Sequence, residues 1–154
     1  MERRIAPPGT AELLALLETL VTASAGRIEA IFRSKQKALM FAAALGWSVQ
    51  QRKPLERRGE PIRYTIFEGA LDDGFVNALA VAEAKDLKVL GPDREDERIR
   101  IFEEYAHGGL VEIQRLMAIP GDPLEQVLQA VMDTKTSDVP PDGVTPDLAR
   151  MFGM

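Results

Sequence analysis

The segment SKQKALMFAAALGW at residues 34–47 carries the clearest structural pattern in the chain. Ser34 is a typical N-cap residue, because its hydroxyl oxygen accepts a hydrogen bond from a backbone N–H group of the first helical turn. The apolar residues that follow predict a helix, which we expect to end at Gly46 because glycine often terminates helices. The three alanines at residues 42–44 have small side chains, so another backbone can approach closely. We therefore expect this helix to lie at the centre of the core.

Helical patterns continue on both sides of this segment. Leucines recur at helical spacing after Thr10, a residue suited to an N-cap. The glycine pair at Gly108 and Gly109 is expected to separate two further helices, because glycine disfavours a helix interior. A short helical piece is expected at residues 28–32. The predicted helices cover residues 10–26, 34–46, 72–82, 92–107, 110–117 and 123–131.

One segment has the pattern of a strand. Residues 62–68, IRYTIFE, alternate in polarity and are rich in β-branched and aromatic side chains. A strand needs a partner, and the candidates lie near Ile5 or at residues 87–90. The preceding residues 50–61 predict a loop, because two prolines and a glycine interrupt them. The predicted fold is therefore mainly α, a compact bundle of about five to six helices with one short β element.

The length of 154 residues indicates about one domain. We expect a single helical domain over residues 1–133 and a flexible, proline-rich C-terminal tail over residues 134–154, where helical periodicity is lost. Leu148, Met151 and Phe152 are apolar residues of this tail that could dock on a partner. The alanine-rich and leucine-rich faces exceed what one small domain hides, so a homodimer is predicted.

Charge is unevenly distributed along the chain. Residues 27–63 hold nine Lys or Arg residues and three acidic ones, a local charge of +6 in a chain of net charge −5, so the remaining residues carry −11. A segregated basic region can bind a phosphate backbone while the acidic remainder faces other partners. The alternative is a solvated basic surface that balances acidic helices of the same fold or of a neighbour. The candidate DNA-binding residues are Arg33, Lys35, Lys37, Arg52, Lys53, Arg57 and Arg58.

Composition excludes several classes of protein. The chain has no cysteine and a single histidine, His107, which excludes disulfides, iron–sulfur clusters, thiol nucleophiles and zinc–thiolate sites. It has neither a P-loop nor a GxGxxG motif, so no nucleotide cofactor is expected, and no haem is expected either. No apolar run reaches the ~18 residues of a membrane span, and the N-terminus lacks the pattern of a signal peptide. A cytoplasmic protein without membrane contact is predicted.

Residues 95–107 contain the most enzyme-like group of side chains. Metal-dependent nucleases hold Mg²⁺ or Mn²⁺ with carboxylates, and the candidate catalytic residues are Glu103 and Glu104, beside His107. Adjacent helical residues diverge by ~100°, so the two glutamates cannot both face one metal ion. Each of them shares a helix face with His107 instead. The alternative is a solvent-facing acidic helix.

Two separated motifs resemble those of one known family. They are FAAALGW at residues 41–47, followed by QQRKPL at residues 50–55, and IFEEYAHGGL at residues 101–110. With the LKVL turn between them, they resemble the DNA phosphorothioation-associated protein 4 family over residues 3–133. The family motif has asparagine where this chain has His107. Because asparagine cannot titrate as a base, the resemblance argues against catalysis by His107.

The resemblance implies a component of a bacterial system that replaces a non-bridging phosphate oxygen of DNA with sulfur. Its implied partners are DNA, an ATPase and a sulfurtransferase, and its implied activity is nicking of one DNA strand. Two alternatives are a non-catalytic DNA-binding or assembly subunit, and a protein adaptor for the ATPase and sulfurtransferase. The composition agrees with DNA engagement, because a chain without cysteine cannot carry sulfur and one without a P-loop lacks the motif of the motor.

Overall fold

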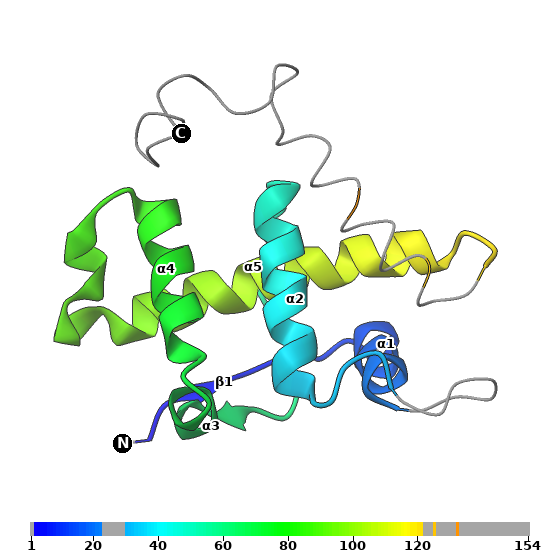
Figure 1. The fold of residues 1–154 in the computed structure, drawn as a ribbon, viewed down its shortest axis with the longest axis horizontal. Coiled ribbons are helices and arrows are strands. Elements are labelled where there is room, and N and C mark those ends of the chain that lie inside the picture. The colour runs from blue at the N-terminus through cyan, green and yellow to red at the C-terminus, as the bar shows by residue number, and fades with distance from the viewer. Residues whose placement is uncertain (1, 23–29, 122–124, 126–131, 133–154) are drawn as a thin grey trace, which may run out of the picture.

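The computed structural model describes residues 2–22, 30–121, 125 and 132, and this part of the chain is mainly helical (Figure 1). It contains five α-helices and one two-stranded sheet, which confirms the predicted fold class. Two short 3₁₀ helices, η1 and η2, lead into the longest helix. In chain order the elements are β1 (Arg4–Ile5), α1 (Ala11–Val21), α2 (Lys35–Ser48), β2 (Ile62–Arg63), α3 (Tyr64–Gly69), α4 (Asp73–Ala84), η1 (Leu87–Leu90), η2 (Pro92–Arg94) and α5 (Glu95–Met117).

Helix α2 lies at the centre of the fold, as its alanines predict. It crosses in front of α5 in Figure 1, and its Ala42 and Ala43 are completely buried. Ser34 caps the helix, because its hydroxyl oxygen accepts a hydrogen bond from the N–H of Lys37 at 3.3 Å. A single cluster of buried apolar side chains joins all five described α-helices. The core is therefore built around the crossing of α2 and α5.

The glycines at this crossing do not end helices, which corrects two predicted boundaries. Helix α2 continues past Gly46, and α5 continues through Gly108 and Gly109 as one helix. A Cβ atom at Gly109 would lie 2.9 Å from the Cα of Ala42 and closer still to its carbonyl group, and a Cβ at Gly46 would collide with the backbone of α5. Glycine is therefore required for the close approach of the two backbones, and tertiary packing outweighs its poor helix propensity.

The strand predicted at residues 62–68 is largely wrong. Its first two residues form β2, which pairs antiparallel with β1 and confirms the partner near Ile5, whereas residues 87–90 form η1. The rest of the segment forms α3. Tyr64 and Phe67 share a face in a helix but would point to opposite faces of a strand. Both rings are buried in the structure, so burial of two aromatic side chains favours the helix.

Helix α1 packs four leucines into the core, as predicted, but it is shorter than its pattern indicates. It follows Thr10, whose side chain makes no capping hydrogen bond, and ends at Val21 rather than near Gly26. The piece predicted to be helical after it is bent in its described part. There the N–H of Phe32 donates to the carbonyl oxygen of Leu20 at 2.9 Å, which ties the chain to the end of α1 instead of to a helix of its own.

Helix α4 begins at Asp73, as predicted, but Asp72 does not cap it with its side chain. The carboxylate of Asp72 accepts hydrogen bonds from Nε2 of Gln36 at 2.5 Å and from Nζ of Lys37 at 2.6 Å. This carboxylate therefore joins the start of α4 to the first turn of α2.

The predicted helix at residues 123–131 and the predicted tail at residues 134–154 lie outside the described residues, apart from position 125. In the described part of the chain, none of the helices combines the length and the apolar character that a bilayer crossing requires.

Candidate nucleic-acid interface

One side of α5 carries a row of polar side chains. They follow one another at spacings of four, three and four residues, so they project from one helix face: Asp96, Arg100, Glu103 and His107. The loop that follows α2 is fastened along this region, because the N–H of Lys53 donates to the carbonyl oxygen of Glu104 at 3.0 Å. The basic loop and the polar face of α5 therefore form one surface.

Glu103 lies at the middle of this face and is almost completely buried, with 4 % of its surface exposed. Its Oε2 accepts hydrogen bonds from the N–H of Ala6 at 2.6 Å and from Nη2 of Arg58 at 2.7 Å, while Oε1 accepts from Nη1 of Arg58 at 3.1 Å. Burial raises the pKa of Glu103, and the hydrogen bonds from Ala6 and Arg58 oppose that rise. Glu103 thus fastens both the segment after β1 and the basic loop to α5.

Glu104 belongs to a second network. It accepts a hydrogen bond from Nε of Arg52 at 2.7 Å, and Nη1 of Arg52 also donates to Glu83 on α4 at 3.1 Å. The hydroxyl group of Tyr105 donates to the same Glu83. Burial, together with this hydrogen bond, raises the pKa of Tyr105 to about 12. The network joins the basic loop to two helices.

These contacts occupy the carboxylates that were candidates for metal binding. Both oxygens of Glu103 accept protein hydrogen bonds, and Glu104 is paired with Arg52. Among the residues that the structure describes, no group of three or more His, Asp or Glu side chains is arranged to hold a metal ion. Mg²⁺ and Mn²⁺ are held by converging oxygen ligands, so these two glutamates do not fit such an ion.

Four of the seven predicted DNA-binding residues make ion pairs within the protein. Lys35 pairs with Glu18 at 2.6 Å, and Lys37 pairs with Asp72 at 2.6 Å. The other two are the arginines described above, Arg52 and Arg58. Their contacts match the alternative in which a basic surface balances acidic helices of the same fold.

The other three predicted residues are exposed and make no ion pair with any described residue: Arg33, Lys53 and Arg57. They do not form one cluster. Arg57 lies at the start of α1, where its carbonyl oxygen accepts from the N–H of Gly9 at 2.7 Å, whereas Arg33 follows Phe32 at the other end. The 11 residues of α1 separate these ends by about 16 Å.

Lys53 and Arg57 line a hollow of about 400 Å³ together with His107, Pro8 and Thr10. Nδ1 of His107 lies 3.1 Å from each of two carbonyl oxygens, those of Lys53 and Pro54. Because a carbonyl oxygen only accepts hydrogen bonds, Nδ1 carries the proton. His107 therefore holds the basic loop in place from α5.

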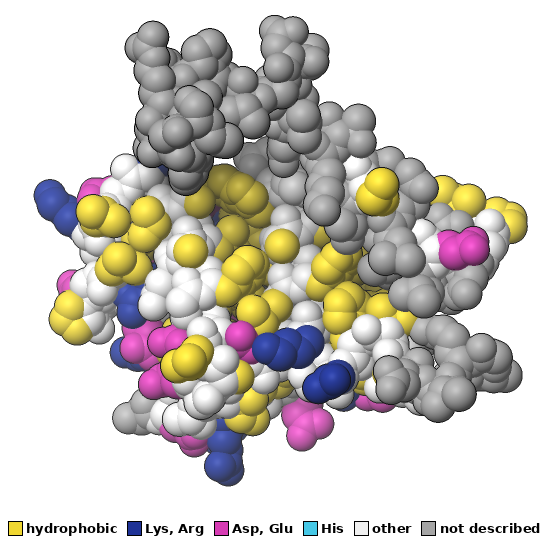
Figure 2. Space-filling view, viewed as in Figure 1, with side chains coloured by type: hydrophobic (Ala, Val, Ile, Leu, Met, Phe, Trp, Pro, Cys, Tyr) yellow, Lys and Arg dark blue, Asp and Glu magenta, His cyan; other side chains and the backbone are white. Residues whose placement is uncertain are grey.

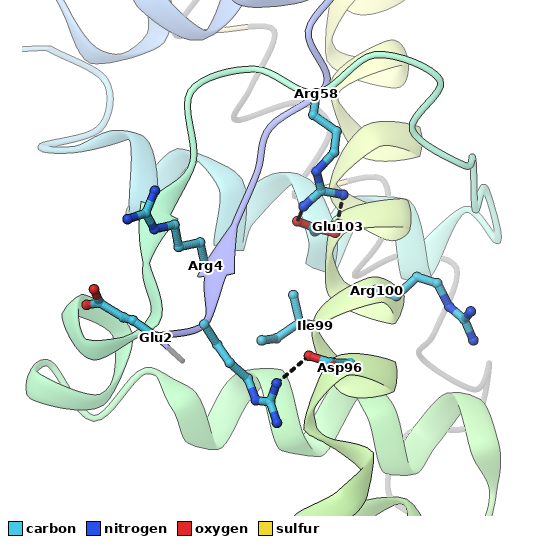
Figure 3. A pocket seen from close by; sticks show the side chains of 8 residues that line it. Glu2, Arg4, Arg58, Asp96, Ile99, Arg100 and Glu103 are labelled. Carbon is cyan, nitrogen blue, oxygen red and sulfur yellow. Dashed lines mark hydrogen bonds and ion pairs between the residues drawn. The ribbon is translucent and has the colours of Figure 1, made fainter.

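A second hollow, of about 380 Å³, lies between β1 and the first half of α5 (Figure 3). It contains three arginines that were not predicted as site residues, namely Arg3, Arg4 and Arg100. Two of them precede the charge-dense region in sequence, and Arg100 lies in an acidic helix. The signal that could have found them is the pairing of a strand near Ile5, together with the seven-residue spacing from Arg100 to His107.

A sequence profile described as DNA sulphur modification system-associated protein 4 matches residues 8–151. The match extends beyond residue 133, where the resemblance seen in the motifs was expected to end, and so includes most of the C-terminal segment. No curated protein and no solved structure matches the chain.

Proposed function

The chain belongs to the DNA sulphur modification system-associated protein 4 family, and from this membership we propose that it is the DNA-binding component of such a system. Its role is to hold the phosphate backbone while other proteins of the system act on the DNA.

The observation that supports this proposal is the pair of uncompensated cations at the hollow beside His107. Lys53 and Arg57 are exposed and make no ion pair among the described residues, although carboxylates surround most other basic side chains of the loop. An uncompensated Lys or Arg gains from a phosphate contact because binding releases counterions from the DNA. The loop that carries them is fixed to α5 through His107 and Glu104, so the cations need little ordering on binding.

Binding is favoured over strand cleavage by the contacts of the two candidate catalytic residues. Glu103 and Glu104 hold arginines of the basic loop, and withdrawing them to bind a metal ion would release that loop. Nicking with Mg²⁺ or Mn²⁺ therefore remains the second candidate function, which the family resemblance favours. The geometry around these glutamates favours a subunit that binds DNA without cleaving it.

The opposite face of the molecule suits protein partners. Figure 2 shows hydrophobic side chains gathered over α2 and α4, with charged side chains concentrated toward the end where α1 and α3 lie. An apolar surface of this kind is typical of protein contacts. We assign it to contact with the system's ATPase or sulfurtransferase, or with a second copy of the chain.

The test is a salt series of DNA affinities measured by fluorescence anisotropy on duplex and single-stranded oligonucleotides. The double substitution Lys53→Ala/Arg57→Ala is expected to make the plot of log K against log salt shallower by about 1.8 on a duplex, or about 1.4 on a single strand. The matched control is Lys85→Asn/Lys88→Ala, which removes two exposed cations after α4. Asparagine suits position 85 because that residue has a φ of 55°.

A wild-type protein without measurable DNA affinity at low salt would disprove the proposal and favour the adaptor. Cleavage is assayed separately with supercoiled plasmid and Mg²⁺ or Mn²⁺. Open-circle product that persists in Glu103→Gln and Glu104→Gln would place nicking elsewhere in the chain, and its loss in those variants would restore the catalytic assignment.

A further inference from the structure

We propose that the hollow between β1 and α5 is a phosphodiester-binding subsite, in which Arg4 and Arg100 contact successive phosphates of a DNA strand. This inference rests on the proposed function and extends the DNA path beyond the predicted basic region. Arg4 precedes that region in sequence and Arg100 follows it.

The first argument is that the acidic side chains of the hollow already have cationic partners. Asp96 pairs with Arg3 at 2.6 Å, and Glu103 is held by Arg58. The third acid, Glu2, lies 3.9 Å from Arg63. An incoming phosphate therefore does not meet an unpaired carboxylate in this hollow.

The second argument is that two guanidinium groups of the hollow have no such partner. Arg4 and Arg100 are exposed and make no ion pair with any residue that the structure describes. Figure 3 shows them on opposite rims, Arg4 on the strand side and Arg100 on the helix side, with both side chains extending outward. This arrangement fits an extended polyanion that crosses the hollow better than a small anion enclosed by it.

The third argument concerns the two paired arginines. Each guanidinium has five N–H groups, and the carboxylates use only some of them. Arg3 donates through Nε and Nη1, and Arg58 donates through Nη1 and Nη2. The remaining N–H groups sit on side chains that are already ordered, so a phosphate oxygen can bind them at low entropic cost.

The hollow is also continuous with the surface that holds Lys53 and Arg57. Arg100 and His107 are seven residues apart on α5, a distance of about 10 Å along the helix axis. Duplex DNA rises about 3.4 Å per phosphate in each strand, so about three phosphates pass over this length. The Arg58–Glu103 pair lies between the two hollows and lines the first of them.

The experiment compares Arg4→Ala/Arg100→Ala with Lys53→Ala/Arg57→Ala and with the Lys85→Asn/Lys88→Ala control, each in the full-length chain. All three remove two positive charges. The arginine double variant is expected to make the salt dependence shallower by about 1.8 on duplex or about 1.4 on single-stranded DNA, as two lost contacts require. Arg4→Lys/Arg100→Lys is expected to retain the wild-type slope, because it keeps both charges. Circular dichroism melts verify that each variant folds.

If the arginine double variant behaves like the lysine control while Lys53→Ala/Arg57→Ala loses slope, the subsite is disproved and the proposed function stands. If the wild-type protein does not bind DNA, both fail together. Calorimetric titration with inorganic pyrophosphate separates a further possibility. Pyrophosphate binding that the arginine substitutions abolish, without a change in DNA slope, would show a small-anion site and overturn the assignment to DNA.

Discussion

The helix crossing makes a sharp stability prediction at Gly109. Substituting Gly109→Ala adds a Cβ atom that would lie 2.9 Å from the Cα of Ala42, with the carbonyl carbon and oxygen of Ala42 closer still. Ordinary contacts of a Cβ atom begin at 3.4 Å, so the backbones of α2 and α5 have to separate by more than half an ångström. Both partners are helical backbone, and no flexible side chain can move aside instead.

The size of the effect follows from two opposing terms. Overpacking a core costs about 1–3 kcal/mol, and the rigid partners here place this site at the upper end. Alanine gains about 1 kcal/mol over glycine from helix propensity. The free energy of unfolding is therefore expected to fall by about 2 kcal/mol. With an m-value of about 2 kcal/mol/M in urea, the unfolding midpoint moves down by about 1 M.

The assay is urea unfolding followed by circular dichroism, and Gly74→Ala is the matched control. Gly74 lies in α4, and a Cβ atom there would have nothing within 4 Å. The control is expected to stabilise the protein by up to about 1 kcal/mol, because only the propensity term applies. A Gly109→Ala protein with a midpoint at or above that of the wild type would refute the reasoning that α2 and α5 meet backbone to backbone.

Three further predictions concern the loop and the tyrosines. Arg52→Ala is expected to lower the free energy of unfolding by about 1–2 kcal/mol, because it breaks two half-buried ion pairs, while the salt dependence of DNA binding stays at the wild-type value. Burial raises the pKa of both tyrosines, Tyr64 and Tyr105, to about 12, so ultraviolet titration of the folded protein should show no tyrosinate near pH 10. Since the unfolded state ionises first, stability should fall as the pH rises from 10 toward 12, and a tyrosinate signal at pH 10 would contradict this burial. His107→Asn places an amide N–H near the position of Nδ1 and is expected to keep DNA affinity, whereas His107→Leu should lose up to about tenfold; equal affinities would show that the loop does not need this hydrogen bond.

Local patterns predicted the helices well where the pattern itself has a local cause. Ser34 caps α2 because its hydroxyl group and the N–H of Lys37 are neighbours in sequence. The leucines of α1 are buried because helical spacing places them on one face. The same reasoning failed at residues 64–68, where alternation indicated a strand. Burial of Tyr64 and Phe67 against the core produced a helix instead.

The candidate site could be predicted only in part, because a charge count does not show which charges meet. The basic region was correctly identified as rich in cations, but its Arg52 and Arg58 turned out to pair with the two glutamates that had been considered for catalysis. These partners are 52 and 45 residues apart in sequence. Arg4 and Arg100 were overlooked for the same reason, since only folding brings β1 beside α5.

The sequence by itself determined the helical class, the capped central helix, the family and the absence of thiol chemistry, because each depends on residue identity or on spacing within a few turns. Tertiary structure alone decided that Gly108 and Gly109 lie inside a continuous helix, because their role depends on the approach of α2 from elsewhere in the chain. It likewise decided which cations remain available for DNA. A positive charge is available only where folding has not placed a carboxylate beside it.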